Sequence, residues 1–138
     1  MLSRILLLIT FTAVLLCHRM LPTNGAESEM IDLWTRQAGT DWPGFLGPQS
    51  NSKSTETGIL TEWPAAGPKL VWQRQLGEGY GIGSICRGRL YQMDRIGNRE
   101  RLCCLNAETG QVLWDFDYPT SYVDMYGYDG GPRCSPLI

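Results

Sequence analysis

The stretch RLCCLNAETGQVLW, residues 101–114, decides how this chain folds. Apolar residues alternate at a period of two on each side of its centre, with Leu102 and Cys104 before the centre and Trp114 after it. Such alternation is typical of half-buried β-strands. Residues 106–110 between the two runs have the composition of a tight turn, and their final glycine tolerates a positive φ. The stretch is therefore predicted to be a β-hairpin.

A second apolar run with a tryptophan, KLVWQ at residues 69–73, places Trp72 42 residues before Trp114. Each tryptophan follows a glycine, which is Gly67 in the earlier copy and Gly110 in the later copy. A repeat of this length lies in the range of β-propeller blades.

Four strands are predicted from the apolar runs and the turn residues between them. They cover residues 81–86, 89–95, 100–105 and 111–118, with turns at 87–88, 96–98 and 107–110. Residues 69–75 are predicted as an earlier strand, and residues 131–138 as the start of a later one. The connection at residues 119–130 is rich in tyrosine and is expected to line one face of the fold.

Residues 107–114, AETGQVLW, resemble the A-x-T-G-x-x-x-W signature of the pyrroloquinoline-quinone-like (PQQ-like) β-propeller repeat. The signature positions are Ala107, Thr109, Gly110 and Trp114. The resemblance implies that the tryptophan of one blade stacks on the turn glycine of the next blade. Gly110 and Trp114, with Trp72 of the earlier copy, are therefore expected to pack blades together as structural residues.

Residues 41–138 also resemble the amino-terminal part of secreted PQQ-like repeat proteins of planctomycete-type bacteria. The landmarks are DWP at 41–43, EWP at 62–64, GPKLVW at 67–72, GEGY at 77–80, YGY at 126–128 and GPR at 131–133. The resemblance implies an all-β fold, a partial β-propeller with about one four-stranded antiparallel blade plus flanking strands of neighbouring blades. This fold is similar to the propeller lipoprotein that assists outer-membrane barrel assembly. A closed propeller needs at least four blades of about 40 residues, so the chain is expected to be a fragment.

The composition suits a turn-rich β protein rather than a disordered chain. The 138 residues include 16 Gly, 8 Pro, 5 Trp and 6 Tyr, and 19% of them are charged. The net charge is −2, and no basic patch with interleaved aromatic residues appears, so nucleic acid is not an expected partner.

The first residues have the pattern of a secretion signal. Arg4 precedes an apolar run at residues 5–17, which is too short to cross a bilayer comfortably. Three segments are predicted: a signal peptide at 1–26, an N-terminal arm and docked loop at 27–66, and a truncated PQQ-like β-propeller repeat region at 67–138. The chain is expected to be exported to the periplasm or the exterior. It would attach to a membrane only if the leader is retained or is lipidated at Cys17.

Four cysteines lie outside the predicted leader: Cys86, Cys103, Cys104 and Cys134. Adjacent cysteines form a ring disulfide against the quinone in some related PQQ-dependent alcohol dehydrogenases. Cys103 and Cys104 fall within a predicted strand and point to opposite faces, whereas a vicinal disulfide needs a distorted turn. One of the two is therefore expected in the core and the other exposed. A disulfide between Cys86 and Cys134 stays open as an alternative in an exported chain.

Sites for common catalytic chemistry are not predicted. His18 is the only histidine and lies in the predicted leader, and no C-x-x-C occurs, which argues against a zinc site and a Ser-His-Asp triad. The glycine run at residues 77–83 precedes a predicted strand rather than a helix, so it is interpreted as a flexible turn and not as a phosphate-binding loop. Asp124, Tyr126 and Asp129 could surround a central-channel site, but loop carboxylates are usually solvated.

The resemblance implies a secreted, non-catalytic scaffold or binding module whose partner is a protein or another component of the cell envelope. The alternative is a fragment of a PQQ-dependent quinoprotein dehydrogenase that oxidises alcohols or sugars with PQQ and Ca²⁺ at the propeller axis. A third reading is a truncated gene product without function. No catalytic, cofactor-binding or metal-binding residue is assigned from the sequence, and PQQ with calcium belongs only to the dehydrogenase alternative.

Overall fold

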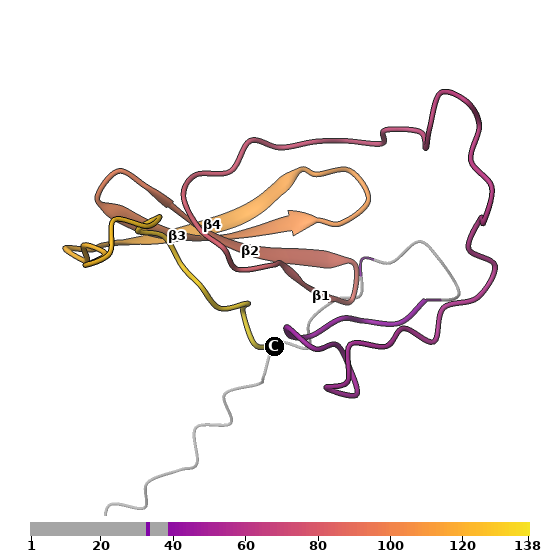
Figure 1. Ribbon diagram of the computed structural model, residues 1–138, viewed down its shortest axis with the longest axis horizontal. Helices are drawn as coiled ribbons and strands as arrows, with labels where there is room; N and C mark the ends of the chain where they lie inside the picture. The colour runs from indigo at the N-terminus through magenta and orange to yellow at the C-terminus, as the bar shows by residue number, and fades with distance from the viewer. Residues whose placement is uncertain (1–32, 34–38) are drawn as a thin grey trace, which may run out of the picture.

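The computed structural model describes residue 33 and residues 39–138 (Figure 1). Their regular structure is one four-stranded antiparallel sheet, and these residues contain no helix. The strands are β1 (Ser84–Cys86), β2 (Arg89–Ile96), β3 (Arg99–Asn106) and β4 (Val112–Pro119), and they lie side by side in chain order. The predicted all-β class is thus confirmed for this part of the chain. The signal peptide, His18 and most of the predicted arm lie outside the described residues.

The first strand is shorter than predicted, because the chain bulges out of the ladder before Ser84. Ser84 pairs with Tyr91 of β2, and the same register would place residue 80 opposite Arg95. Glu78 occupies that place instead, so residues 79–83 contain two residues more than the ladder needs. Glycines make this close packing feasible, since a Cβ at Gly83 would lie only 2.5 Å from Leu90 Cδ1.

The turn between β3 and β4 is held by its own first residue. The side-chain oxygen of Asn106 accepts hydrogen bonds from the amides of Glu108 and Thr109 at 3.0 and 3.1 Å. The Gly110 amide donates to the Asn106 carbonyl at 2.9 Å, and Gly110 has a φ of 71°. An Asx turn that ends in a left-handed glycine is the local reason for the hairpin.

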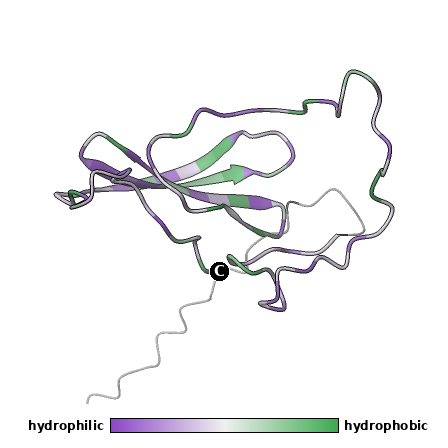
Figure 2. Cartoon of the chain, viewed as in Figure 1, coloured by the Kyte–Doolittle hydropathy of each residue, from purple (hydrophilic) through white to green (hydrophobic). Residues whose placement is uncertain are grey.

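The pairing register gives the sheet two chemically different faces, because directly opposed residues share a face. The apolar face carries Tyr91, Met93, Leu102, Cys104, Trp114 and Phe116. The polar face carries Gln92, Asp94, Arg101, Cys103, Asp115 and Asp117. In β3 and β4 the apolar residues gather towards the connecting turn and the hydrophilic ones towards the opposite end (Figure 2).

Cys103 and Cys104 are both buried, so the prediction that one of them is exposed was wrong. Alternation assigns the two side chains to opposite faces, but it does not show that both faces are covered at this point of a central strand. Burial raises the pKa of each thiol. All four described cysteines are free, so no disulfide joins Cys86 to Cys134.

Residues 69–75 do not form the predicted strand and belong to no regular element; Trp72 anchors them. The indole N–H of Trp72 donates to the Ala107 carbonyl at 3.0 Å. A Cβ built on Gly110 would lie 2.7 Å from the Trp72 ring, a distance that real side chains do not adopt. The ring therefore rests directly on the glycine. No ladder partner for residues 69–75 lies within the described chain, which explains why the strand does not form.

Trp42 lies on a glycine in a similar way and joins its loop to the sheet. A Cβ on Gly47 would lie 2.7 Å from the Trp42 ring. Trp42 also forms an antiparallel bridge with Ile85 of β1, with N–H···O distances of 2.9 and 2.8 Å. The loop that contains Trp42 is therefore docked along β1.

The carboxyl-terminal residues 131–138 lie beside residues 78–84 and run in the same direction, but they do not form the predicted strand. The amides of Tyr80 and Gly81 donate to the Pro132 carbonyl at 2.8 and 3.1 Å, and the Ser84 hydroxyl donates to the Pro136 carbonyl. Pro132 and Pro136 have no N–H, which prevents a regular ladder in this segment.

The strand β4 is an open edge of the sheet. All eight of its residues are exposed, and no described strand pairs with its outer side. Its exposed side chains include Trp114 and Phe116 on the apolar face. An apolar edge strand of this length is a surface at which another chain can pack.

We predict that Trp72→Ala lowers the free energy of unfolding by about 2–3 kcal/mol, since the half-buried ring would be lost from the turn. Gly110→Ala should lower the free energy of unfolding by about 2–3 kcal/mol as well, because it adds a Cβ against the ring and strains a left-handed backbone. Urea unfolding of the purified chain measures both changes.

Gly97→Ala is the matched control for Gly110→Ala. Gly97 is also left-handed, with a φ of 57°, but no described atom beyond its chain neighbours lies within 4 Å of a Cβ there. This variant should lose only about 1 kcal/mol, the cost of the backbone conformation. If both glycine variants lose the same amount, Trp72 does not rest on Gly110.

Candidate functional site

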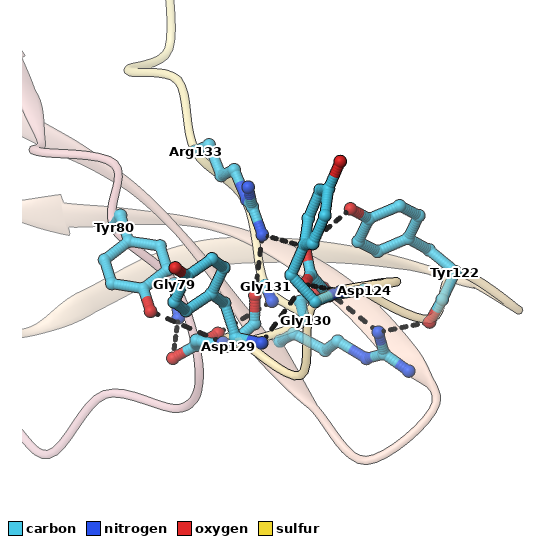
Figure 3. A network of polar contacts seen from close by, with 11 residues as sticks. Gly79, Tyr80, Tyr122, Asp124, Asp129, Gly130, Gly131 and Arg133 are labelled. Atoms are coloured by element: carbon cyan, nitrogen blue, oxygen red, sulfur yellow. Dashed lines mark hydrogen bonds and ion pairs between the residues drawn. The ribbon is translucent and has the colours of Figure 1, made fainter.

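A polar network joins the tyrosine-rich loop to the residues before β1 (Figure 3). We call residues 120–130 the tyrosine loop, because Tyr122, Tyr126 and Tyr128 lie in it. The loop follows β4 and ends where the carboxyl-terminal segment docks against Gly79 and Tyr80.

Asp124 organises the tyrosine loop through hydrogen bonds from four donors. Its Oδ1 accepts from the amides of Tyr126 and Tyr128 at 2.9 and 3.1 Å. Its Oδ2 accepts from the Tyr122 hydroxyl at 3.1 Å and from the Arg133 guanidinium. Enclosure of the carboxylate acts to raise its pKa, but these donors outweigh that effect and hold the pKa below its ordinary value.

Asp129 connects the same loop to the glycine run that precedes β1. Its carboxylate accepts from the amides of Gly79 and Gly131 at 3.0 and 2.8 Å. Arg133 lies between Asp124 and Tyr80, with its guanidinium carbon 5.9 Å from the Tyr80 ring centroid (Figure 3). Such a distance allows a cation–π contact.

Arg95 at the end of β2 holds both ends of the tyrosine loop. One terminal nitrogen donates to the carbonyls of Tyr122 and Gly130 at 2.8 and 3.0 Å. Its Nε donates to the carbonyl of Gly97 in the β2–β3 turn at 2.7 Å. The loop is therefore fixed to the sheet by one side chain that bridges three backbone carbonyls.

The fixed backbone presents aromatic and apolar side chains to solvent. Met125 and Tyr126 are 83% and 77% exposed, and Val123 and Tyr128 are also exposed. The rings of Tyr126 and Tyr128 lie 6.4 Å apart. A surface of this kind suits binding, because its side chains need no ordering of the backbone before contact.

The structure brings the candidates Asp124, Tyr126 and Asp129 together, and it corrects one expectation about them. The side chain of Asp124 is only 4% exposed, so it is not a solvated loop carboxylate. Sequence reasoning missed Arg95 and Arg133, whose roles depend on strand register and loop geometry. The GPR landmark that contains Arg133 was the available signal.

Among the repeat positions, the Ala107 carbonyl accepts a hydrogen bond from the Trp72 indole, and Gly110 lies against the Trp72 ring. Thr109 accepts a hydrogen bond from the Gln111 amide at 3.3 Å. Trp114 is 44% exposed and makes an edge contact with Tyr91, with ring centroids 6.0 Å apart.

A second polar cluster, formed by Asp94 and Arg101, lies on the polar face of the sheet. It binds the backbone of Gly77, five residues after Trp72. Arg101 donates to the two carboxylate oxygens of Asp94 at 2.9 and 2.6 Å, and the Gly77 amide donates to Asp94 at 2.9 Å. Asp94 is buried, which acts to raise its pKa. The bonds from Arg101 and Gly77 outweigh burial and lower the pKa below 3.8. The pair is interpreted as structural, since the Asp94 side chain is buried and its carboxylate is engaged by donors of the chain itself.

The described part of the chain contains no group of three or more His, Cys, Asp or Glu side chains that could hold a metal ion. Within the same residues, no helix is long and apolar enough to cross a membrane. A pocket lined by Gly44, Phe45 and residues 133–137 is mainly apolar and lies where the carboxyl-terminal segment meets the Trp42 loop.

Comparisons with known proteins returned no match: no family model, no curated protein and no solved structure is similar enough to this chain to be identified.

We predict that Asp94→Asn lowers the free energy of unfolding by about 3 kcal/mol at neutral pH, because Arg101 would lose its buried partner. The folded-state pKa of Asp94 lies below the unfolded value, so its stabilisation is complete above pH 3.8 and is lost as the pH falls through the folded-state pKa. The difference from the wild-type chain should stay constant from about pH 7 to pH 5 and shrink below about pH 4.

Asp117→Asn is the control for Asp94→Asn, since Asp117 pairs with Arg99 on the exposed surface. Its effect on urea unfolding should be clearly smaller at neutral pH. A difference between Asp94→Asn and wild type that does not change with pH would contradict the account of the ion pair.

We also predict that Asp124→Ala speeds hydrogen exchange of the Tyr126 and Tyr128 amides by about tenfold or more, because their acceptor is removed. The amides of the β2–β3 ladder should exchange at unchanged rates, which controls for global destabilisation. Unchanged exchange at Tyr126 and Tyr128 would show that Asp124 does not hold the loop.

Proposed function

We propose that the chain is part of a PQQ-like β-propeller repeat protein that acts as an exported, non-catalytic binding scaffold. The observation that carries the proposal is the contact of Trp72 with Gly110 and the Ala107 carbonyl. It joins the first copy of the repeat to the turn of the second copy, whose tryptophan follows Trp72 by 42 residues, as the resemblance implies for successive blades. The four-stranded meander β1–β4 supports the same assignment, since a propeller blade has this topology.

The docking of the carboxyl-terminal segment is a second support for a propeller. Every blade begins at the central axis and runs outward, so the first strands of neighbouring blades run in the same direction. Residues 78–84 lead into β1, and residues 131–136 lie beside them in the same direction. The proposal therefore places residues 131–138 at the start of the following blade.

The polar network favours binding over catalysis. The carboxylates of Asp124 and Asp129 are each engaged by two or more donors from this chain. The most exposed side chains of the loop are instead aromatic or apolar: Val123, Met125, Tyr126 and Tyr128. Tyrosine and methionine are enriched in protein–protein interfaces, so a protein or another envelope component is the expected partner.

The quinoprotein dehydrogenase is the second candidate. Such an enzyme binds Ca²⁺, so the carboxylates of this chain can be compared with the ligands that calcium needs. Calcium takes six to eight oxygen ligands, mostly carboxylates and carbonyls. Asp124 and Asp129 are the loop carboxylates, and donors of the chain already occupy their oxygens. These residues do not fit a calcium site, and no reaction step is assigned to them.

The two functions are separated by titrating PQQ, with and without Ca²⁺, into the complete propeller protein that the proposal implies. We expect no saturable change in quinone absorbance and no calcium-dependent heat, with the apoenzyme of a quinoprotein dehydrogenase as positive control. Saturable, calcium-dependent binding in the micromolar range would instead favour the dehydrogenase.

A photoreactive residue at Met125 tests the binding role of the tyrosine loop in the producing cell. The scaffold should give one defined cross-linked species from position 125 and none from Ile59, which is also exposed but belongs to a segment far from the loop (Figure 1). Equal labelling from both positions would argue against a binding surface on the loop.

A further inference from the structure

The Trp42 loop, residues 41–48, is bonded to the free edge of β1. Among the strands of the sheet, β1 pairs only with β2, which leaves its other edge free for the loop. The Ile85 amide donates to the Trp42 carbonyl at 2.8 Å, and the Trp42 amide donates to the Ile85 carbonyl at 2.9 Å. Just after β1, the Arg87 amide donates to the Asp41 carboxylate at 3.0 Å. The loop is therefore attached to the carboxyl end of this strand.

The Trp42 loop also contacts the carboxyl-terminal segment of the chain. The Ile138 amide donates to the Pro43 carbonyl at 3.2 Å. This segment runs beside β1 in the same direction, and its Pro136 carbonyl accepts from the Ser84 hydroxyl. Ile138 and Ile85 therefore lie at the same end of two neighbouring segments, and the loop bridges them (Figure 1).

Contacts within the Trp42 loop fix its shape. Gly47 has a φ of 76°, and a Cβ there would lie 2.7 Å from the Trp42 ring. The Gly47 amide donates to the Gly44 carbonyl at 3.0 Å, and the Ser50 amide donates to the Gly47 carbonyl at 3.1 Å. The indole ring is thus folded back onto its own turn, so the loop meets β1 as a compact unit.

In the proposed propeller, the place where this loop docks is the central axis. The first strand of each blade is the innermost one, so the free edge of β1 faces the central channel. The proposal makes the carboxyl-terminal segment the innermost strand of the following blade. A loop that is bonded to both innermost strands then lies at the channel, at the end where these strands finish. The tyrosine loop lies at the opposite end, because it leads from β4 to the beginning of the second innermost strand.

We propose that the Trp42 loop closes one end of the central channel, so that a ligand or partner reaches the channel only from the end that carries the tyrosine loop. Asp41 is the only charged residue of the loop, and its carboxylate is bonded to the Arg87 amide. The loop therefore fills its place with apolar side chains and a bonded backbone. The inference rests on the proposed function, because only a propeller has such a channel.

Hydrogen exchange of the purified chain tests the docking of the loop, which does not depend on the propeller. The Ile85 and Arg87 amides donate to the Trp42 loop, so both should exchange slowly in the wild-type chain. Gly47→Ala puts a Cβ against the indole ring and should speed both exchange rates by at least about tenfold. Unchanged rates in the β2–β3 ladder would show that the sheet stays folded.

Gly58→Ala is the matched control for Gly47→Ala. Gly58 has a φ of 75°, and no described atom beyond its chain neighbours lies within 4 Å of a Cβ there. This variant should leave exchange at Ile85 unchanged. Trp42→Ala removes the same contact from the side of the ring and should act as Gly47→Ala does. Fast exchange at Ile85 in the wild-type chain, or equal effects of the two glycine variants, would overturn the proposal.

The crystal structure of the complete propeller protein tests the position of the loop. We expect residues 41–48 to lie across the axis, at the end opposite the tyrosine loop. A propeller whose channel is open at that end would overturn the closure and leave the proposed function standing. A complete protein that is not a propeller would overturn both.

Cys86 reports access to the closed end in the same complete protein, since it is the last residue of β1. Burial and the neighbouring Asp41 carboxylate raise the pKa of its thiol. Labelling by a small maleimide should be at least about tenfold faster in Gly47→Ala than in the wild-type protein, and unchanged in Gly58→Ala. Cys103 and Cys104 are buried and should stay unlabelled, which controls for unfolding. Equal labelling of Cys86 with and without Gly47→Ala would contradict control of access by the loop.

Discussion

The rest of the structure depends on the contact between the Trp72 indole and Gly110. The ring can reach the turn only because residue 110 has no side chain and adopts a left-handed conformation. Its N–H also satisfies the Ala107 carbonyl at 3.0 Å. A segment without a ladder of its own is thereby attached to the end of the sheet, and its continuation brings the Gly77 amide to Asp94, which pairs with Arg101 on the polar face.

This attachment links local turn chemistry to the burial of charge. Gly77 follows Trp72 closely in the chain, and its amide completes the hydrogen bonds of Asp94. A buried carboxylate with three donors stabilises the fold, whereas the same group without them would be costly. On the far side of the sheet, Arg95 uses three backbone carbonyls to position the tyrosine loop. Single side chains of the sheet therefore hold the irregular segments: Asp94 binds the segment that contains Gly77, and Arg95 binds the tyrosine loop.

Local patterns predicted the parts of the fold that depend on local physics. Period-two alternation and turn residues located β2, β3 and β4 to within about two residues. The strand at residues 69–75 was predicted wrongly, because a ladder needs a partner and alternation does not reveal whether one is present. The joint burial of Cys103 and Cys104 was missed for a related reason, since a sequence pattern assigns faces but not what covers them. Arg95 and Arg133 could not be identified as loop anchors without the register that brings them there.

The contact of Trp72 with Gly110 is tested most directly by nuclear magnetic resonance of the purified chain. The account predicts nuclear Overhauser effects between the Trp72 ring and the Gly110 α-protons, which should shift upfield because they lie against the indole face. The Trp72 indole N–H should also exchange slowly with solvent, since it donates to the Ala107 carbonyl. Gly110 α-protons at random-coil shifts, with no Overhauser effect to Trp72, would contradict the account.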